Sequence, residues 1–174
     1  MKTNIAALRE RKDIGCVLLS AAVTADQVAS KASAAAGVEL PLAAGAINTA
    51  AGRTALWLTP RSWLIRCSVE EESNLAGALN AAFPDKLAHA VGFTDALCWL
   101  ELSELGALDL LTEGGFVSFE RNGIPVGHAK RTLIAQVAVI VAREGDSVWL
   151  VAVERSRAQY FVNWLSAAVQ FREC

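Results

Sequence analysis

Residues 54–67, with the sequence TALWLTPRSWLIRC, constrain the fold of this chain more than any other segment. They contain two apolar runs, each with a tryptophan followed by leucine, and the tetrapeptide TPRS joins the runs. Two such runs around a short turn-forming segment are typical of a β-hairpin. Ser68 and Glu71 follow at the spacing of a capping box, so the sequence predicts a hairpin that leads directly into a helix.

A strand and a helix are predicted before this hairpin. Residues 14–20 form a continuous apolar run, which favours a buried strand. Thr24 and Gln27 have the spacing of another capping box, and the alanine-rich stretch after them predicts a helix to Ala36 that ends at Gly37. The segment 40–52 is rich in glycine and alanine, contains a proline and is interpreted as a loop.

The helix after the hairpin is supported by charge and by periodicity. Residues 70–72 are three glutamates in its first turn, where the helix dipole favours negative charge. Its apolar residues recur at helical spacing and are Leu75, Leu79, Ala82 and Phe83. Pro84 is expected to close this half of the chain.

The second half repeats this order of elements. The predicted elements are a strand over 95–103, a short helix over 104–113, a long β-rich run over 132–143, a turn at 144–146, a return strand over 148–153 and a final helix. Ser156 and Gln159 supply a third capping box for that helix. Its predicted buried face consists of Tyr160, Phe161, Trp164, Leu165 and Ala168.

Each half therefore has the order strand, helix, hairpin, helix. A unit of this kind cannot cover both faces of its small sheet, whereas two units can pack around a common core with their helices outside. We expect a single domain, 1–174, with two similar halves at about 14–84 and 95–171. The predicted fold class is α+β, with a pseudo-duplicated and mainly antiparallel sheet.

The composition of the chain favours some classes of function and argues against others. Hydrophobic residues make up 53% of the chain and charged residues 20%, which favours a permanent partner, although the high alanine content offers an alternative explanation. The net charge is −2 and no basic stripe is present, which argues against nucleic-acid binding. Residues 158–171 form the longest charge-free run, shorter than the ~20 residues of a membrane span. The N-terminus lacks the apolar core of a signal peptide, so a cytoplasmic location is expected.

Few residues could carry chemistry. His89 and His128 lie far apart in predicted loops, and no local nucleophile or orienting carboxylate accompanies either one. Asp95 and Glu101 flank a strand, and Cys98 lies in an apolar strand, which raises a thiol pKa and lowers its reactivity. The sequence holds no glycine-rich phosphate loop and no zinc-ligand spacing. We therefore predict no catalytic, cofactor-binding or metal-binding residue in this chain.

The cysteines and tryptophans are expected to be mainly structural. The four cysteines are Cys16, Cys67, Cys98 and Cys174, and the first three lie in apolar runs that favour burial. The five tryptophans are Trp57, Trp63, Trp99, Trp149 and Trp164. Three or four of these are expected to fill the core, and the remaining one or two could anchor an interface, where tryptophan is enriched.

Five segments carry a resemblance to a known family. They are VELP at 38–41, ALWLTPRSWL at 55–64, DALCWLELS at 95–103, GHAKRTL at 127–133 and SRAQYFVNWL at 156–165. In this order and spacing the chain resembles the gamma subunits of heterotetrameric sarcosine oxidase. That family is similar to the folate-binding module of the glycine-cleavage aminomethyltransferase, which agrees with the duplicated α+β architecture.

The resemblance implies a non-catalytic subunit of a flavoenzyme complex that demethylates sarcosine oxidatively. The implied partners are alpha, beta and delta subunits, which would hold FAD, FMN, NAD, zinc and tetrahydrofolate. Substitutions at 104–105 and 118–119 depart from the family pattern and leave the parent substrate open between sarcosine and N-methylglutamate. The sequence is also compatible with a free-standing folate-binding or methyl-transfer module that uses Asp95, Glu101 and the tryptophans, and with a homo-oligomer.

Overall fold

The computed structural model describes residues 7–103, 111–112, 114–115 and 123–171. The chain divides into two compact units. The first unit comprises residues 12–95, and the second comprises residues 96–174 together with residues 1–11. The short helix predicted over 104–113 lies almost entirely outside the described residues.

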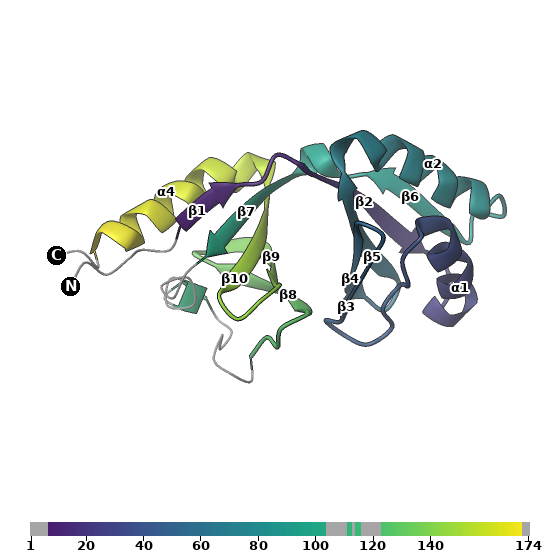
Figure 1. Cartoon of the computed structure of the whole chain (residues 1–174), viewed down its shortest axis with the longest axis horizontal. Coiled ribbons are helices and arrows are strands. Elements are labelled where there is room, and N and C mark those ends of the chain that lie inside the picture. The colour runs from purple at the N-terminus through teal and green to yellow at the C-terminus, as the bar shows by residue number, and fades with distance from the viewer. Residues whose placement is uncertain (1–6, 104–110, 113, 116–122, 172–174) are drawn as a thin grey trace. The chain divides into compact units, whose positions relative to one another are not determined.

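The first unit is one five-stranded sheet in the order β3-β4-β5-β2-β6, and every described pair in it is antiparallel (Figure 1). Its elements are β2 (Ile14–Ala21), α1 (Ala25–Ala36), β3 (Ile47–Ala50), β4 (Arg53–Thr59), β5 (Ser62–Ser68), the 3-10 turn η1 (Val69–Glu71), α2 (Glu72–Ala82) and β6 (Ala88–Gly92). The predicted strand at 14–20, both helices and the hairpin are confirmed. Two expectations were wrong, because the segment 40–52 contains β3 and because β6 follows Pro84 in the same unit.

Local hydrogen bonds explain where the helices of this unit begin and end. The side-chain amide oxygen of Gln27 accepts hydrogen bonds from the Thr24 N–H at 3.3 Å and the Thr24 hydroxyl at 3.1 Å. Gly37 ends α1 with a φ of 66°, a left-handed conformation that glycine adopts without a steric penalty. The Glu71 carboxylate accepts from the N–H and hydroxyl of Ser68 at the start of the second helical segment.

Both helices of the first unit cover the same face of its sheet. The core between them contains Val17, Leu19, Val28, Ala32, Ala36, Trp63, Ile65, Leu75, Leu79 and Phe83, among other buried residues. Trp63 is fully buried, and its indole N–H donates to the carbonyl oxygen of Pro41 at 2.8 Å. This bond ties the segment that follows α1 to the middle of the sheet.

Without β3, the sheet order β4-β5-β2-β6 is that of a ferredoxin-like split βαβ unit. The outer edge of β6 is partly blocked, because the Asn80 side chain accepts from the Ala90 N–H at 2.9 Å and donates to the Ala90 carbonyl at 2.8 Å. A side-chain amide placed in this way occupies the groups that another strand would need for pairing.

The second unit is a five-stranded antiparallel sheet in the order β1-β7-β10-β9-β8. Its elements are β1 (Ala7–Glu10), β7 (Leu97–Ser103), β8 (His128–Ile134), β9 (Val137–Arg143), β10 (Val148–Glu154) and α4 (Arg155–Phe171), and the 3-10 turn η2 (Thr94–Ala96) precedes β7. It has its own core, built mainly from alternate residues of β7, β9 and β10 with Phe161 and Leu165 of α4.

The two sheets have equivalent strand orders, which explains the repeated pattern in the sequence. The meander β8-β9-β10 corresponds to β3-β4-β5, and β7 corresponds to β2. In the first sheet β6 lies beside β2, and in the second sheet β1 lies in the equivalent position beside β7 (Figure 1). Unlike the other strands of the second sheet, β1 comes from the N-terminal end of the chain. The second sheet therefore gains its last strand through a long-range pairing.

Three predictions for the second unit were wrong. The run 132–143 is not one strand, because a turn at Ala135 and Gln136 separates β8 from β9. Both turn residues have positive φ angles, 50° and 64°, a combination typical of a tight hairpin turn. The final helix begins at Arg155, before Ser156, and Tyr160 is 56% exposed rather than on the buried face with Phe161.

Candidate functional site

The two histidines lie in different units and neither lies in a loop, contrary to expectation. His89 is an exposed residue of β6, beside Ser20 of β2 in the ladder. His128 is the first residue of β8, and its Nδ1 lies 3.3 Å from the carbonyl oxygen of Val126. Among the described residues, no ion pair or hydrogen bond gives either imidazole the carboxylate or nucleophile that acid–base chemistry requires.

The acidic candidates have structural partners or lie at the surface. Glu101 of β7 forms an ion pair with Arg11 at 2.6 Å, which links β7 to the end of β1. Asp95 is exposed in η2. The capping interpretation of the glutamate run is confirmed for Glu71, which bonds to Ser68. Glu72 instead accepts from the N–H of Thr94 at 3.0 Å, a contact with the segment that follows β6.

The thiols are buried, as predicted. Cys16, Cys67 and Cys98 are buried in strands. Burial, followed by the nearby Glu71 carboxylate, raises the pKa of the Cys67 thiol to about 11. A thiol with this pKa is almost entirely protonated at neutral pH and is a poor nucleophile.

The core role predicted for three or four tryptophans is confirmed for three of them. Trp63, Trp99 and Trp149 are at most 2% exposed. Trp164 packs as a partly buried residue against the core of the second unit. Trp57 is half-buried, and it lies opposite Trp63 in the β4–β5 ladder, so both side chains lie on the helix-covered face.

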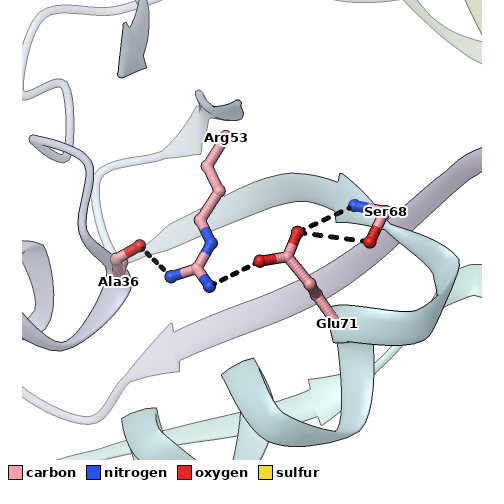
Figure 2. A network of polar contacts seen from close by, with 4 residues as sticks. All are labelled: Ala36, Arg53, Ser68 and Glu71. Carbon is pink, nitrogen blue, oxygen red and sulfur yellow. Dashed lines mark hydrogen bonds and ion pairs between the residues drawn. The ribbon is translucent and has the colours of Figure 1, made fainter. Parts of the chain in front are cut away.

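A polar network connects the end of α1 to the beginning of α2 (Figure 2). One guanidinium nitrogen of Arg53 donates to the Ala36 carbonyl at 2.8 Å, and the other donates to Glu71 at 2.9 Å. On its other side, the Glu71 carboxylate accepts from Ser68. The hydrogen bond from Arg53, and then that from the Ser68 N–H, hold the pKa of Glu71 below its usual value of 4.5.

We predict that this network makes stability depend on pH. The pKa of Glu71 is lower in the folded protein than in the unfolded chain. Its contribution to the free energy of unfolding is therefore complete above the pKa of the unfolded state, and it is lost as the pH falls through the pKa of the folded state. Replacement of Glu71 by glutamine should therefore lower the melting temperature at pH 7, and the difference from the wild type should shrink below pH 4.5. Thermal unfolding between pH 7 and pH 3 measures this difference.

The control for this prediction is Glu70→Gln. Glu70 lies exposed in the same 3-10 turn, and its replacement removes the same formal charge. The melting temperature of this variant should vary with pH as that of the wild type does. A Glu71→Gln profile that runs parallel to the wild type at every pH would contradict the assigned role of the network.

The residues that surround Trp57 form an open pocket of about 670 Å³ within the first unit. Its apolar walls are Ala22, Val23, Ala25, Leu42, Ala44, Trp57 and Pro60, and its polar residues are Thr24, Asp26, Gln27 and Arg61. The volume falls in the range of about 300–1,000 Å³ that is usual for binding pockets. No reactive cysteine or histidine lines it, so it suits binding rather than covalent chemistry.

Hydrogen bonds fix two of the segments that line this pocket. On the turn between β4 and β5, the Thr59 hydroxyl accepts from the Arg61 N–H at 3.2 Å and contacts the Ser62 hydroxyl at 2.6 Å. The Arg61 carbonyl accepts from the Ala21 N–H at 2.8 Å, which holds the turn against the end of β2. The segment that contains Leu42 is positioned by the bond from Trp63 to the carbonyl of Pro41, the residue before Leu42.

The sequence pattern did not reveal this pocket. Three segments of the first unit build it, 22–27, 42–44 and 57–61, and none of them contains a recognisable binding motif. The available signal was Trp57 beside the turn that carries Arg61, since both residue types are common at interface centres.

Two general findings apply to the described part of the chain. None of its helices is both long and apolar enough to span a membrane. Within the same residues, His, Cys, Asp and Glu side chains do not gather in groups of three or more that could hold a metal ion.

Comparisons with known proteins agree with one another. A family model described as "Sarcosine oxidase, gamma subunit family" matches residues 21–170. Sarcosine oxidase subunit gamma from Arthrobacter sp. is 29% identical over 174 residues, and the match covers 94% of this chain and 85% of that protein.

The fold comparisons extend this similarity. A chain of the heterotetrameric sarcosine oxidase from Corynebacterium sp. U-96 is similar with a TM-score of 0.86 and 24% identity, over 97% of this chain and 86% of that chain. Aminomethyltransferase T of the glycine cleavage system from Bartonella henselae has a TM-score of 0.68 and 9% identity, over 92% of this chain and 45% of that chain. The family resemblance and the aminomethyltransferase-like α+β fold inferred from sequence are both confirmed.

Proposed function

Because this chain belongs to the sarcosine oxidase gamma subunit family, we propose that it is a non-catalytic structural subunit of a sarcosine oxidase-type complex. The complex would carry out the oxidative demethylation of sarcosine in the cytoplasm. The observation that carries this proposal is the family match over residues 21–170, which includes most of both units.

The surroundings of several titratable side chains support the non-catalytic part of the proposal. The Cys67 thiol has a raised pKa, and His89 is exposed on a strand without a described carboxylate partner. Glu71 and Glu101 are each engaged with an arginine. We therefore assign the flavin and the amine-oxidising residues to other subunits.

The proposed partners are alpha, beta and delta subunits. FAD, FMN, NAD, zinc and tetrahydrofolate would be held by those subunits and not by this chain. The parent substrate is proposed to be sarcosine, and N-methylglutamate is the alternative to be tested beside it.

We predict that the chain purified alone shows no visible flavin absorbance and oxidises neither sarcosine nor N-methylglutamate. Co-expression with the other subunits should give a complex that contains this chain in stoichiometric amount and oxidises one of the two substrates. Size-exclusion chromatography with absorbance spectroscopy, followed by an assay of hydrogen peroxide or reduced acceptor, measures both properties.

Two results would contradict this proposal. Flavin bound to the isolated chain, or substrate turnover by it, would show that it has its own active site. An active complex that assembles equally well without this chain would show that it is not a structural subunit. Saturable binding of tetrahydrofolate to the isolated chain, followed by tryptophan fluorescence, would instead favour a folate-binding module.

A further inference from the structure

The pocket beside Trp57 has the character of a docking surface. Trp57 is half-buried in one wall, and Leu42 in another is 54% exposed, although it is a large apolar residue. An exposed leucine and a half-buried tryptophan that line the same concave surface indicate a site that a partner covers. The pocket contains both Trp57 and Arg61. Tryptophan and arginine are among the residue types most enriched at energetically important contacts.

The charges around the pocket indicate which kind of partner fits. Asp26 lies in the first turn of α1, where the positive end of the helix dipole compensates its negative charge. Arg61 has no such compensation, because its described hydrogen bonds involve only its backbone and leave the guanidinium without a partner among the described residues. The uncompensated charge of the pocket is therefore positive, and its complement is a carboxylate.

We propose that this pocket receives a segment of a partner subunit that carries an apolar side chain next to an aspartate or glutamate. The apolar side chain would pack on Trp57 and Leu42, and the carboxylate would pair with Arg61. The inference rests on the proposed subunit role and adds to it the surface and the chemistry of docking. The fixed turn around Arg61 favours such a contact, since little conformational freedom of the backbone is lost on binding.

Affinity measurements on the reconstituted complex test this inference. The chain is captured on a sensor and titrated with the co-purified partner subunits, and the variants are Arg61→Glu and Trp57→Ala. Each should weaken binding about thirtyfold, as expected for residues at the centre of an interface. Raising the salt concentration should weaken the wild-type complex more than the Arg61→Ala complex, because the ion pair is screened.

Matched controls lie in the second unit. Arg131→Glu reverses the charge of an exposed arginine on β8, and Leu133→Ala shortens a leucine that is 45% exposed on the same strand. Both should bind partners as the wild type does. Thermal unfolding of every variant identifies any loss of binding that is due to unfolding. A photocrosslinking amino acid in place of Leu42 should label a partner peptide that contains an acidic residue.

The outcomes distinguish the docking surface from the subunit role. If the wild type assembles and folded Arg61→Glu and Trp57→Ala variants bind with wild-type affinity, the docking inference is wrong and the subunit role stands. If the wild type does not assemble, both are wrong. If benzoate, used as a small carboxylate probe, binds to the isolated chain through Arg61 while assembly is unaffected, the pocket is a small-molecule site instead.

Discussion

Replacement of Trp63 by alanine is expected to lower the free energy of unfolding by about 3–5 kcal/mol, the usual cost of removing a large buried aromatic side chain. Trp63 is fully buried between the sheet and the two helices of the first unit. The cost has two parts, which are the lost burial of the ring and the cavity that rigid neighbours leave unfilled. The Pro41 carbonyl also loses its indole donor.

Two further variants separate these contributions in urea unfolding. Trp63→Phe keeps an aromatic ring but removes the donor to Pro41, and the unpaired buried carbonyl should cost about 1–3 kcal/mol. Trp57→Ala removes the opposite tryptophan of the same hairpin, which is half-buried, and should cost less than Trp63→Ala. Equal losses for the two alanine variants would contradict the assignment of Trp63 to the core and Trp57 to the pocket.

Trp63 also links stability to the proposed docking surface. Its hydrogen bond positions Pro41, and the next residue, Leu42, forms a wall of the pocket. The Trp63→Phe variant should therefore bind partners more weakly than its stability alone would suggest, because the wall is no longer fixed.

Features determined by residues close in sequence were predicted well. The capping residues Thr24 and Ser68 act on groups three positions away, and Gly37 ends α1 through its own backbone conformation. The hairpin of β4 and β5 was also found, because its turn separates two continuous apolar runs. In each case the information and its structural effect lie within a few residues.

Features determined by distant pairings were missed. β3 is a four-residue strand, INTA, that exists because it pairs with β4, and β1 exists because it pairs with β7. The turn at residues 135–136 was missed for a different reason. Ala135 and Gln136 are not typical turn residues, although both have positive φ angles. The pocket was missed because its three segments meet only after the sheet has formed.

The family similarity gives the subunit role, whereas the proposed docking surface comes from burial and charge. The α4 helix illustrates why periodicity alone was not sufficient for such a surface. The sequence pattern placed Tyr160 and Phe161 on the same predicted face of the helix. In the structure, however, Tyr160 is 56% exposed and Phe161 is fully buried. Only the packing of each unit shows which apolar residues remain available to a partner.

Replacement of Gly15 by alanine is expected to destabilise the first unit by about 3 kcal/mol or more, at the upper end of the usual cost of overpacking. Gly15 is buried in β2 and pairs with Cys67 of β5. A Cβ atom at this position would lie 2.5 Å from the Ser68 carbonyl oxygen and 2.8 Å from the Val69 Cα. Both are backbone atoms, so no side-chain rotation can relieve the contact and the strands must move apart.

The same substitution at Gly77 is the matched control, and it should have the opposite sign. Gly77 is exposed in α2, and a Cβ atom there would have no neighbour within 4 Å. Alanine at this position should stabilise the protein by about 0.5–1 kcal/mol, because it favours the helix and reduces the freedom of the unfolded chain. Urea unfolding of the two variants therefore compares one chemical change in two surroundings. A Gly15→Ala variant as stable as the wild type would show that the junction of β5 and η1 is not held tightly against β2.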